Sequence, residues 1–174
     1  MSRILIIGNA GGGKSVLARK LAAKRGLPCH EIDRIMWRPG WALAPRDEYE
    51  AAHAALIAGE DWVIEGLGWD ESLPERFARA TEIILIDMPI WMHFWLAAER
   101  QFLWLQGKLE NPVAGIAEAP TTEAMFETLW ETDRQSMPAI RRLTDEAERA
   151  GKAVTRISSV AELNAFSDSL ATKS

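Results

Sequence analysis

The sequence contains little cysteine and little tyrosine. Cys29 is the only cysteine among 174 residues, so the chain cannot form an internal disulfide bond. A lone cysteine is typical of a protein from a reducing compartment, and we expect Cys29 to be a small strand residue rather than a nucleophile. One tyrosine stands against eight tryptophans. Most of these tryptophans are expected to pack in the core and between helices.

Long apolar runs and long basic runs are also absent. The most apolar stretch, residues 88–98, contains Pro89 and His93 and is too short to cross a bilayer. The first residues lack the pattern of a signal peptide, so we expect a cytoplasmic protein without a membrane partner. The net charge is −5 and the basic residues are scattered. Direct nucleic-acid binding is therefore not expected.

Strand-like apolar runs alternate with helical patterns along the chain. Strands are predicted over about 3–8, 29–32, 62–65, 82–87 and 152–157, and helices over about 14–25, 46–58, 72–79, 90–106, 122–150 and 160–170. This alternation predicts an α/β fold in which a parallel sheet carries helices on both faces. We expect one domain, residues 1–174, with a Gly- and Pro-rich, lid-like insert at about 105–122. Residues 37–41 are expected to form a loop, and the longest helix is expected to bend near Pro138.

Residues 8–15, Gly-Asn-Ala-Gly-Gly-Gly-Lys-Ser, fit the G-x-x-x-x-G-K-[ST] pattern of the phosphate-binding P-loop. An apolar run precedes them and a helical pattern follows, which is the context that the motif needs. Backbone N–H groups of such a loop form an anion nest at a helix N-terminus. We expect Lys14 to reach the phosphates of ATP and Ser15 to bind Mg²⁺. The expected nucleotide-binding residues are Gly8, Asn9, Ala10, Gly11, Gly12, Gly13, Lys14, Ser15 and Val16.

Acidic residues stand at the carboxyl ends of three other predicted strands, where ligands bind in open α/β sheets. Asp87 ends an apolar strand and is expected to hold Mg²⁺ directly or through water, with a helix cap as the alternative. Asp33 is expected to bind metal-linked water or to accept a proton from an acceptor hydroxyl, with a turn cap as the alternative. Glu65 and Gly66 are expected to contact the acceptor, Glu65 could instead contact Mg²⁺, and a solvated strand end is the structural alternative for Glu65.

Positive charge beside the moving phosphate is needed for phosphoryl transfer. Arg100 and Arg134 are the catalytic candidates for this role, whereas Arg141 and Arg142 are expected on a solvated helix face. The three histidines share no metal-ligand spacing, and His93 is expected to pack rather than to catalyse.

The P-loop, the segment Trp37-Arg38-Pro39-Gly40-Trp41 and the run Leu85-Ile86-Asp87-Met88-Pro89 together resemble the adenylate-kinase-like P-loop proteins called topology-modulation proteins. The resemblance implies a three-layer nucleoside-monophosphate-kinase fold with a five-stranded parallel sheet in the order 2-3-1-4-5. It also implies ATP, Mg²⁺ and phosphoryl transfer. Trp37 and Trp41 follow the second strand and are expected to line the acceptor site. The acceptor pattern Gly-x-Pro-Arg of adenylate kinases is replaced by Gly66-Leu67-Gly68-Trp69, so the acceptor stays open.

Three functions fit these observations. The first is a kinase that transfers the γ-phosphoryl group of ATP to a small-molecule or nucleotide acceptor. The second is a nucleotide-binding regulatory protein or slow ATPase, for which exposed tryptophans would provide the interface with a protein partner. Action on nucleic acid is suggested only by the name of the family, and the acidic balance opposes it. The sequence does not define the oligomeric state.

Overall fold

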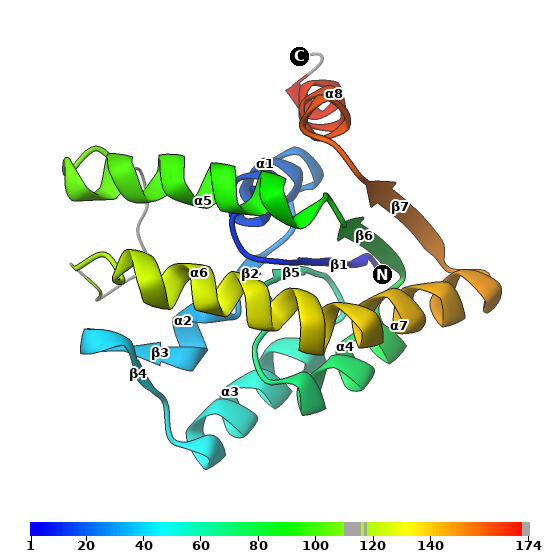
Figure 1. Ribbon diagram of the computed structural model, residues 1–174. Coiled ribbons are helices and arrows are strands. Elements are labelled where there is room, and N and C mark those ends of the chain that lie inside the picture. The colour runs from blue at the N-terminus through cyan, green and yellow to red at the C-terminus, as the bar shows by residue number, and fades with distance from the viewer. Residues whose placement is uncertain (110–115, 117, 172–174) are drawn as a thin grey trace.

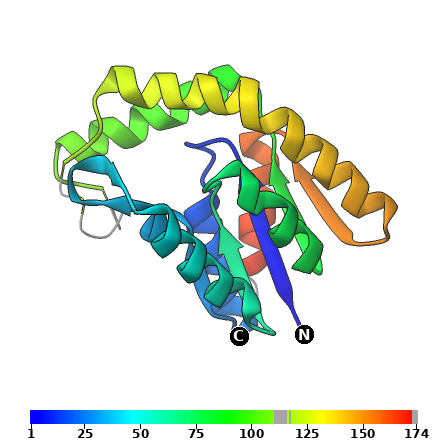
Figure 2. The same cartoon turned by 90° about the horizontal axis from the view of Figure 1, so that it is seen from below.

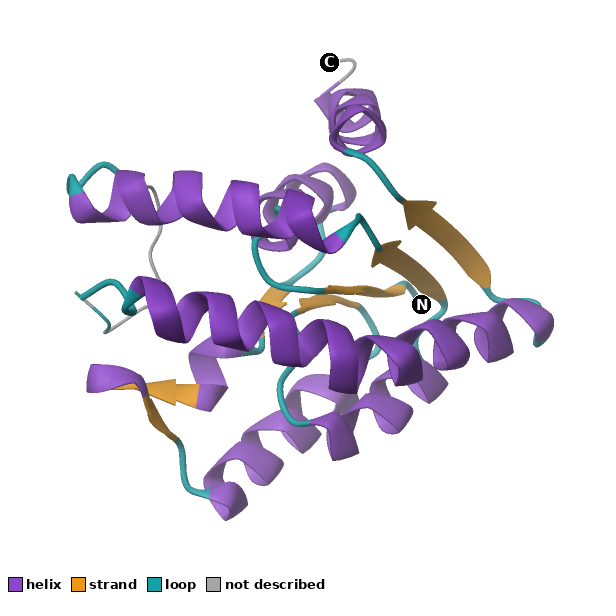
Figure 3. Cartoon of the chain, in the orientation of Figure 1, coloured by secondary structure: helices purple, strands orange, loops and turns teal. Residues whose placement is uncertain are grey.

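The computed structural model describes residues 1–109, 116 and 118–171, and its centre is a five-stranded parallel sheet. The strands are β1 (Arg3–Gly8), β2 (Cys29–Glu31), β5 (Trp62–Glu65), β6 (Glu82–Ile86) and β7 (Ala153–Ile157). Their spatial order is β2-β5-β1-β6-β7 (Figures 1 and 3). Counted along the chain within this sheet alone, that order is 2-3-1-4-5, as expected. The central strands carry continuous apolar runs because both faces of the sheet are covered.

Helices cover both faces of the sheet and form two separate apolar layers (Figures 1 and 2). On one face, α1 (Lys14–Arg25) and α8 (Val160–Ala171) pack against the side chains that include Ile4 and Ile6. On the other, α3 (Arg46–Ala58), α4 (Leu73–Arg79) and α7 (Met137–Arg149) pack against those that include Leu5 and Ile7. Successive residues of β1 therefore serve opposite layers, as the period of a strand requires. The α/β class is confirmed.

The segment after β2 is a small substructure rather than the predicted loop. It contains α2 (Asp33–Met36) and two short antiparallel strands, β3 (Trp37–Arg38) and β4 (Ala42–Leu43). The turn between the strands, η1 (Pro39–Trp41), closes through Gly40, whose φ is 76°. Glycine accepts this left-handed conformation without steric cost. The prediction failed because these strands are too short to show an alternating pattern.

The long helix predicted over 122–150 is interrupted. It consists of α6 (Thr122–Glu131), a π-helical turn η3 (Thr132–Ser136) and α7. The interruption precedes Pro138 rather than coinciding with it, and this proline stands in the first turn of α7, where its missing N–H costs nothing. π-Helical turns inside helices are frequent at functional sites.

The remaining elements are η2 (Asp70–Ser72) and α5 (Ile90–Leu105). In Figure 1, α5, α6 and the β3–β4 hairpin extend past the sheet on the side of the P-loop. The lid-like insert predicted at about 105–122 lies partly outside the described residues, since 110–115 and 117 are not described. No helix in the described part of the chain is long and apolar enough to span a membrane.

Candidate nucleotide and acceptor site

The P-loop connects β1 to α1 and takes backbone conformations that glycine alone accepts comfortably. Gly8, Gly11 and Gly13 have φ values of 145°, 73° and 76°. A Cβ atom on Gly8 would lie 2.1 Å from the carbonyl oxygen of Ile86, and one on Gly11 would lie 2.9 Å from that of His93. The loop is thus packed tightly between β6 and α5. It leads directly into the N-terminus of α1 at Lys14, which is the geometry of a phosphate site.

The two residues that end the motif already contact polar groups of the site. Lys14 Nζ donates to the carbonyl oxygen of Asn9 at 2.7 Å, so the side chain folds back over the loop. Ser15 Oγ donates to Glu65 Oε1 at 2.8 Å. Burial lowers the pKa of Lys14, while the negative charges of Glu65 and Asp33 oppose that change. A phosphate anion at the loop would add to these charges and favour the protonated ammonium.

Strand register brings Glu65 to the P-loop. Glu65 pairs with Ile6 of β1 on one side and with Glu31 of β2 on the other. It is 3% exposed, and burial raises the pKa of this carboxyl group to about 7 against the pull of Lys14. Burial also raises the pKa of Asp33, which Lys14 and Arg100 oppose. The charge of Lys14 therefore acts on two carboxyl groups whose pKa values are raised by burial.

The third carboxylate of this region is neutralised within the protein. Glu31 accepts from Arg19 at 2.6 Å and from Arg34 at 3.1 Å.

Behind β5, the fully buried Arg76 donates to the carbonyl oxygens of Gly66, at 2.7 Å, and Leu67. The backbone of Gly66 is therefore held from the side of α4, which fixes the chain just after Glu65.

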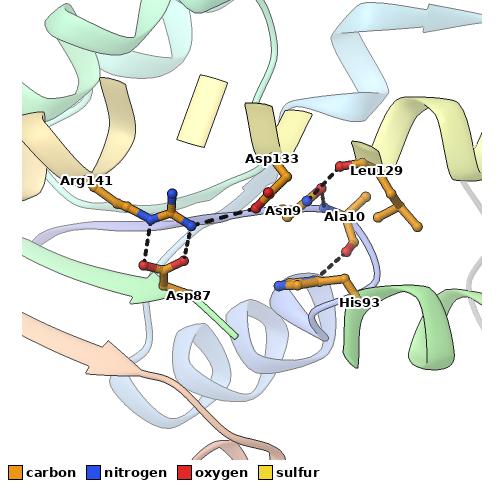
Figure 4. A network of polar contacts seen from close by, with 7 residues as sticks. All are labelled: Asn9, Ala10, Asp87, His93, Leu129, Asp133 and Arg141. Atoms are coloured by element: carbon orange, nitrogen blue, oxygen red, sulfur yellow. Dashed lines mark hydrogen bonds and ion pairs between the residues drawn. The ribbon is translucent and has the colours of Figure 1, made fainter. Parts of the chain in front are cut away.

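Asp87 and Arg141 form an ion pair between the end of β6 and α7. Arg141 Nε and Nη2 donate to the two carboxylate oxygens of Asp87 at 2.9 and 2.8 Å, and Nη2 lies 3.7 Å from Asp133 Oδ1 (Figure 4). Paired forks of this kind are strong and directional. Arg141 is therefore held beside Asp87, although its side chain remains 41% exposed, and Arg142 pairs with Glu146 on an exposed face. No local pattern could reveal a partner 54 positions away.

A side chain of α5 and a backbone carbonyl group of α6 contact the P-loop (Figure 4). His93 of α5 is 2% exposed, and its Nδ1 lies 2.8 Å from the carbonyl oxygen of Ala10. The side chain of Asn9 donates to the carbonyl oxygen of Leu129 in α6 at 2.9 Å and accepts from the N–H of Ala10 at 2.8 Å. His93 packs, as expected, but what it packs against is the loop itself. Any movement of α5 or α6 is thereby coupled to the P-loop.

The predicted acceptor tryptophans lie together and extend toward α5. The rings of Trp37 and Trp41 are 5.6 Å apart, and Trp41 is 5.8 Å from Trp104. Arg100 stands over the Trp104 ring at 5.6 Å. Trp41 Nε1 also donates to the carbonyl oxygen of Glu118 at 3.0 Å. The hairpin and α5 are joined by this aromatic contact, which the sequence did not reveal because Trp104 is distant along the chain.

The two candidate arginines, Arg100 and Arg134, lie in different surroundings. Arg100 stands over the Trp104 ring, and its positive charge acts on both Lys14 and Asp33. Arg134 is exposed and stands over the Trp130 ring at 5.9 Å. Among the described residues, no recorded contact joins Arg134 to Lys14, Asp33 or Glu65. Val16, at the end of the expected nucleotide-binding segment, is also exposed.

A parallel sheet in this order, with a P-loop between its central strand and the following helix, is the arrangement that the resemblance to adenylate-kinase-like proteins implied. The structure is similar to shikimate kinase from Bacteroides thetaiotaomicron, with a TM-score of 0.57, 14% sequence identity, and coverage of 97% of this chain and 95% of that chain. Shikimate kinase from Aquifex aeolicus has a TM-score of 0.48 and 16% identity, with coverage of 97% of this chain and 94% of that chain. A gluconokinase from Sinorhizobium meliloti has a TM-score of 0.43 and 17% identity, with coverage of 81% of this chain and 97% of that chain. No protein-family model and no curated protein matches the sequence. The fold of P-loop kinases is confirmed, and the resemblance to topology-modulation proteins stays a prediction.

Proposed function

We propose that the protein is an ATP-dependent phosphotransferase acting on a small-molecule or nucleotide acceptor. The observation that carries the proposal is the P-loop with its two terminal side chains beside buried carboxyl groups. Lys14 would neutralise charge on the phosphates, and the backbone of residues 8–16 would cradle them. The resemblance to adenylate-kinase-like proteins and the kinase names of the structural neighbours support the same reaction class.

Mg²⁺ fits the side chains of the site. The Ser15 hydroxyl and the carboxylates of Glu65 and Asp87 offer the hard oxygen atoms that this ion prefers. No group of three or more His, Cys, Asp or Glu residues in the described chain could hold a metal ion by itself. The nucleotide would therefore complete the coordination, as is usual in kinase sites. Ser15 and Asp87 remain the proposed metal residues, with Glu65 orienting Ser15 through their hydrogen bond.

The acceptor would lie between the P-loop and the β3–β4 hairpin, where Asp33, Trp37, Trp41, Glu65 and Gly66 are proposed to contact it. Asp33 is proposed to take the proton of the attacking hydroxyl, because its raised pKa makes it a better base near neutral pH. Bound ATP with Mg²⁺ would supply the phosphoryl group and neutralise its oxygens. Arg100 is proposed to stabilise the charge that develops during transfer. Arg134 would need to turn away from Trp130 to share that role.

A regulatory protein or slow ATPase is the second candidate. Trp91, Trp95 and Trp130 are exposed, and such side chains often mark protein interfaces. A regulator of this kind would bind nucleotide and release ADP slowly, without dependence on a small-molecule acceptor.

Release of ADP from ATP, measured over a panel of acceptors, separates the two functions. Sugars, other polyols, hydroxy acids and nucleoside monophosphates should be tested with Mg²⁺. The kinase predicts that one class increases ADP release at least tenfold, and that the phosphorylated acceptor appears in equal amount. Asp33→Asn should abolish this increase while ATP binding persists, and Lys20→Ala on the exposed side of α1 should change neither. Slow ADP release that no acceptor increases would favour the regulator.

A further inference from the structure

One face of α5 carries a stripe of exposed apolar side chains. Trp91, Trp95, Phe102 and Leu105 are between 62% and 72% exposed. With the exposed Ala98 they are spaced four, three, four and three residues apart, which places all five on one side of the helix. We call these five residues the α5 stripe. Large aromatic side chains are rarely left in water as a contiguous group without a partner.

The other side of α5 accounts for its packing within the protein. His93, Ala97, Gln101 and Trp104 are the buried residues of the helix, and Arg100 stands over Trp104, away from the stripe. The stripe is therefore neither part of the core nor part of the proposed acceptor site. Glu99, at its margin, and Arg100 are the only charged residues between 90 and 105.

The order of side-chain sizes in the α5 stripe is the same in both directions: large, large, small, large, large. If two copies of α5 cross antiparallel on a two-fold axis at Ala98, Trp91 faces Leu105 of the other copy and Trp95 faces Phe102. Residue i then contacts j and j contacts i, as an isologous interface requires. The small central residue lets the two helices approach closely.

We propose that the protein forms a two-fold dimer through antiparallel pairing of the α5 stripe with the α5 stripe of a second copy. Aromatic side chains bury about 150–250 Å² each. With about two-thirds of that area exposed, the three aromatic residues offer roughly 400 Å² per copy. A standard interface buries about 800 Å² per partner, so the three aromatic residues of the α5 stripe supply about half of that area, and we expect a weak, reversible dimer.

Sedimentation equilibrium of the wild-type chain should show a monomer–dimer equilibrium between about 1 and 100 µM. Trp95→Glu and Leu105→Glu should each weaken association at least tenfold, because each places charge in the apolar contact. Leu43→Glu, on an exposed leucine of β4, is the matched control and should leave the equilibrium unchanged. Circular dichroism should show that all three variants fold. A wild-type chain that stays monomeric at 100 µM would overturn the proposal, as would equal association of all variants.

A cysteine at the proposed two-fold axis tests the geometry directly. In a Cys29→Ser background, Ala98→Cys should form a disulfide-linked dimer under mild oxidation, because a disulfide needs Cα atoms about 4.4–6.8 Å apart. Ala54→Cys, on the exposed side of α3, should remain uncrosslinked under the same conditions. Equal crosslinking of the two variants, or none by Ala98→Cys in a chain that dimerises, would show that α5 does not pair in this way.

Discussion

At the scale of single residues, Glu65 is a carboxyl group at a strand end that the fold removes from water. A carboxylate at a strand end could be solvated, but Glu65 is buried and bonded to Ser15. Burial raises its pKa from 4.5 to about 7. Asp33 and Lys14 interact electrostatically with each other, and their place beside the phosphates stays a prediction. The sequence did not predict the pairing of Asp87 with Arg141, because contacts between distant segments leave no local pattern.

Glu65 makes stability depend on pH. Because its pKa is higher in the folded chain, the folded state binds more protons than the unfolded state between pH 4.5 and about 7. The contribution of Glu65 to the free energy of unfolding is therefore present below pH 4.5 and is lost as the pH rises to about 7. The loss is at most roughly 3 kcal/mol. Glu65→Gln should flatten this dependence, as measured by urea unfolding from pH 5 to 8. Parallel curves for the two proteins would show that Glu65 titrates as an ordinary carboxyl group.

Asp87 and its partner can be separated by substitution. If Asp87 supports Mg²⁺, Asp87→Asn should raise the Mg²⁺ concentration needed for ADP release by about tenfold. Arg141→Ala keeps the carboxylate and should raise it much less, although both variants lose the ion pair. Titration of activity with Mg²⁺ at saturating ATP measures the difference. Equal changes in the two variants would assign Asp87 a structural role only.

At the scale of elements, the strands, α1, α3 and α5 were predictable because each has a clear period or an apolar run with turn residues at its ends. The β3–β4 hairpin and the π-helical turn were not. Short strands and a single widened turn depend on tertiary packing, which propensity does not encode. The packing of α5 on the P-loop is likewise a tertiary feature, and it makes the glycines of the loop sensitive to substitution.

Gly11→Ala should weaken ATP binding as well as stability. The new Cβ would lie 2.9 Å from the His93 carbonyl oxygen, at a φ of 73°. Gly26→Ala, at the end of α1, has a similar φ of 66° but no atom within 4 Å of the new Cβ. Both variants should lose about 1–2 kcal/mol of stability from the left-handed backbone, but only Gly11→Ala should bind ATP more weakly. Calorimetric titration and urea unfolding measure the two effects. Normal ATP affinity in Gly11→Ala would show that α5 moves away from the new Cβ without disturbing the P-loop.

At the scale of the whole molecule, the P-loop, Glu65 and Asp33 lie at the carboxyl ends of neighbouring parallel strands. The helix α5 and the β3–β4 hairpin extend past the sheet at that edge (Figure 1). This convergence follows from the parallel sheet, so the site could be located from the strand pattern alone. The identity of the acceptor could not be predicted, because it depends on how tryptophans from separate segments and Arg100 pack together. The central claim is that the loop between β1 and α1 binds the phosphates of ATP.

Calorimetric titration of a non-hydrolysable ATP analogue with Mg²⁺ tests that claim most directly. Lys14→Ala removes the ammonium group that would neutralise the phosphates and should weaken binding at least tenfold, which is about 1.4 kcal/mol. Lys20→Ala removes an exposed charge of the same helix and should bind like the wild type. Equal affinity of all three proteins for the analogue, with equal turnover of ATP, would contradict the assignment of residues 8–15 as the nucleotide site.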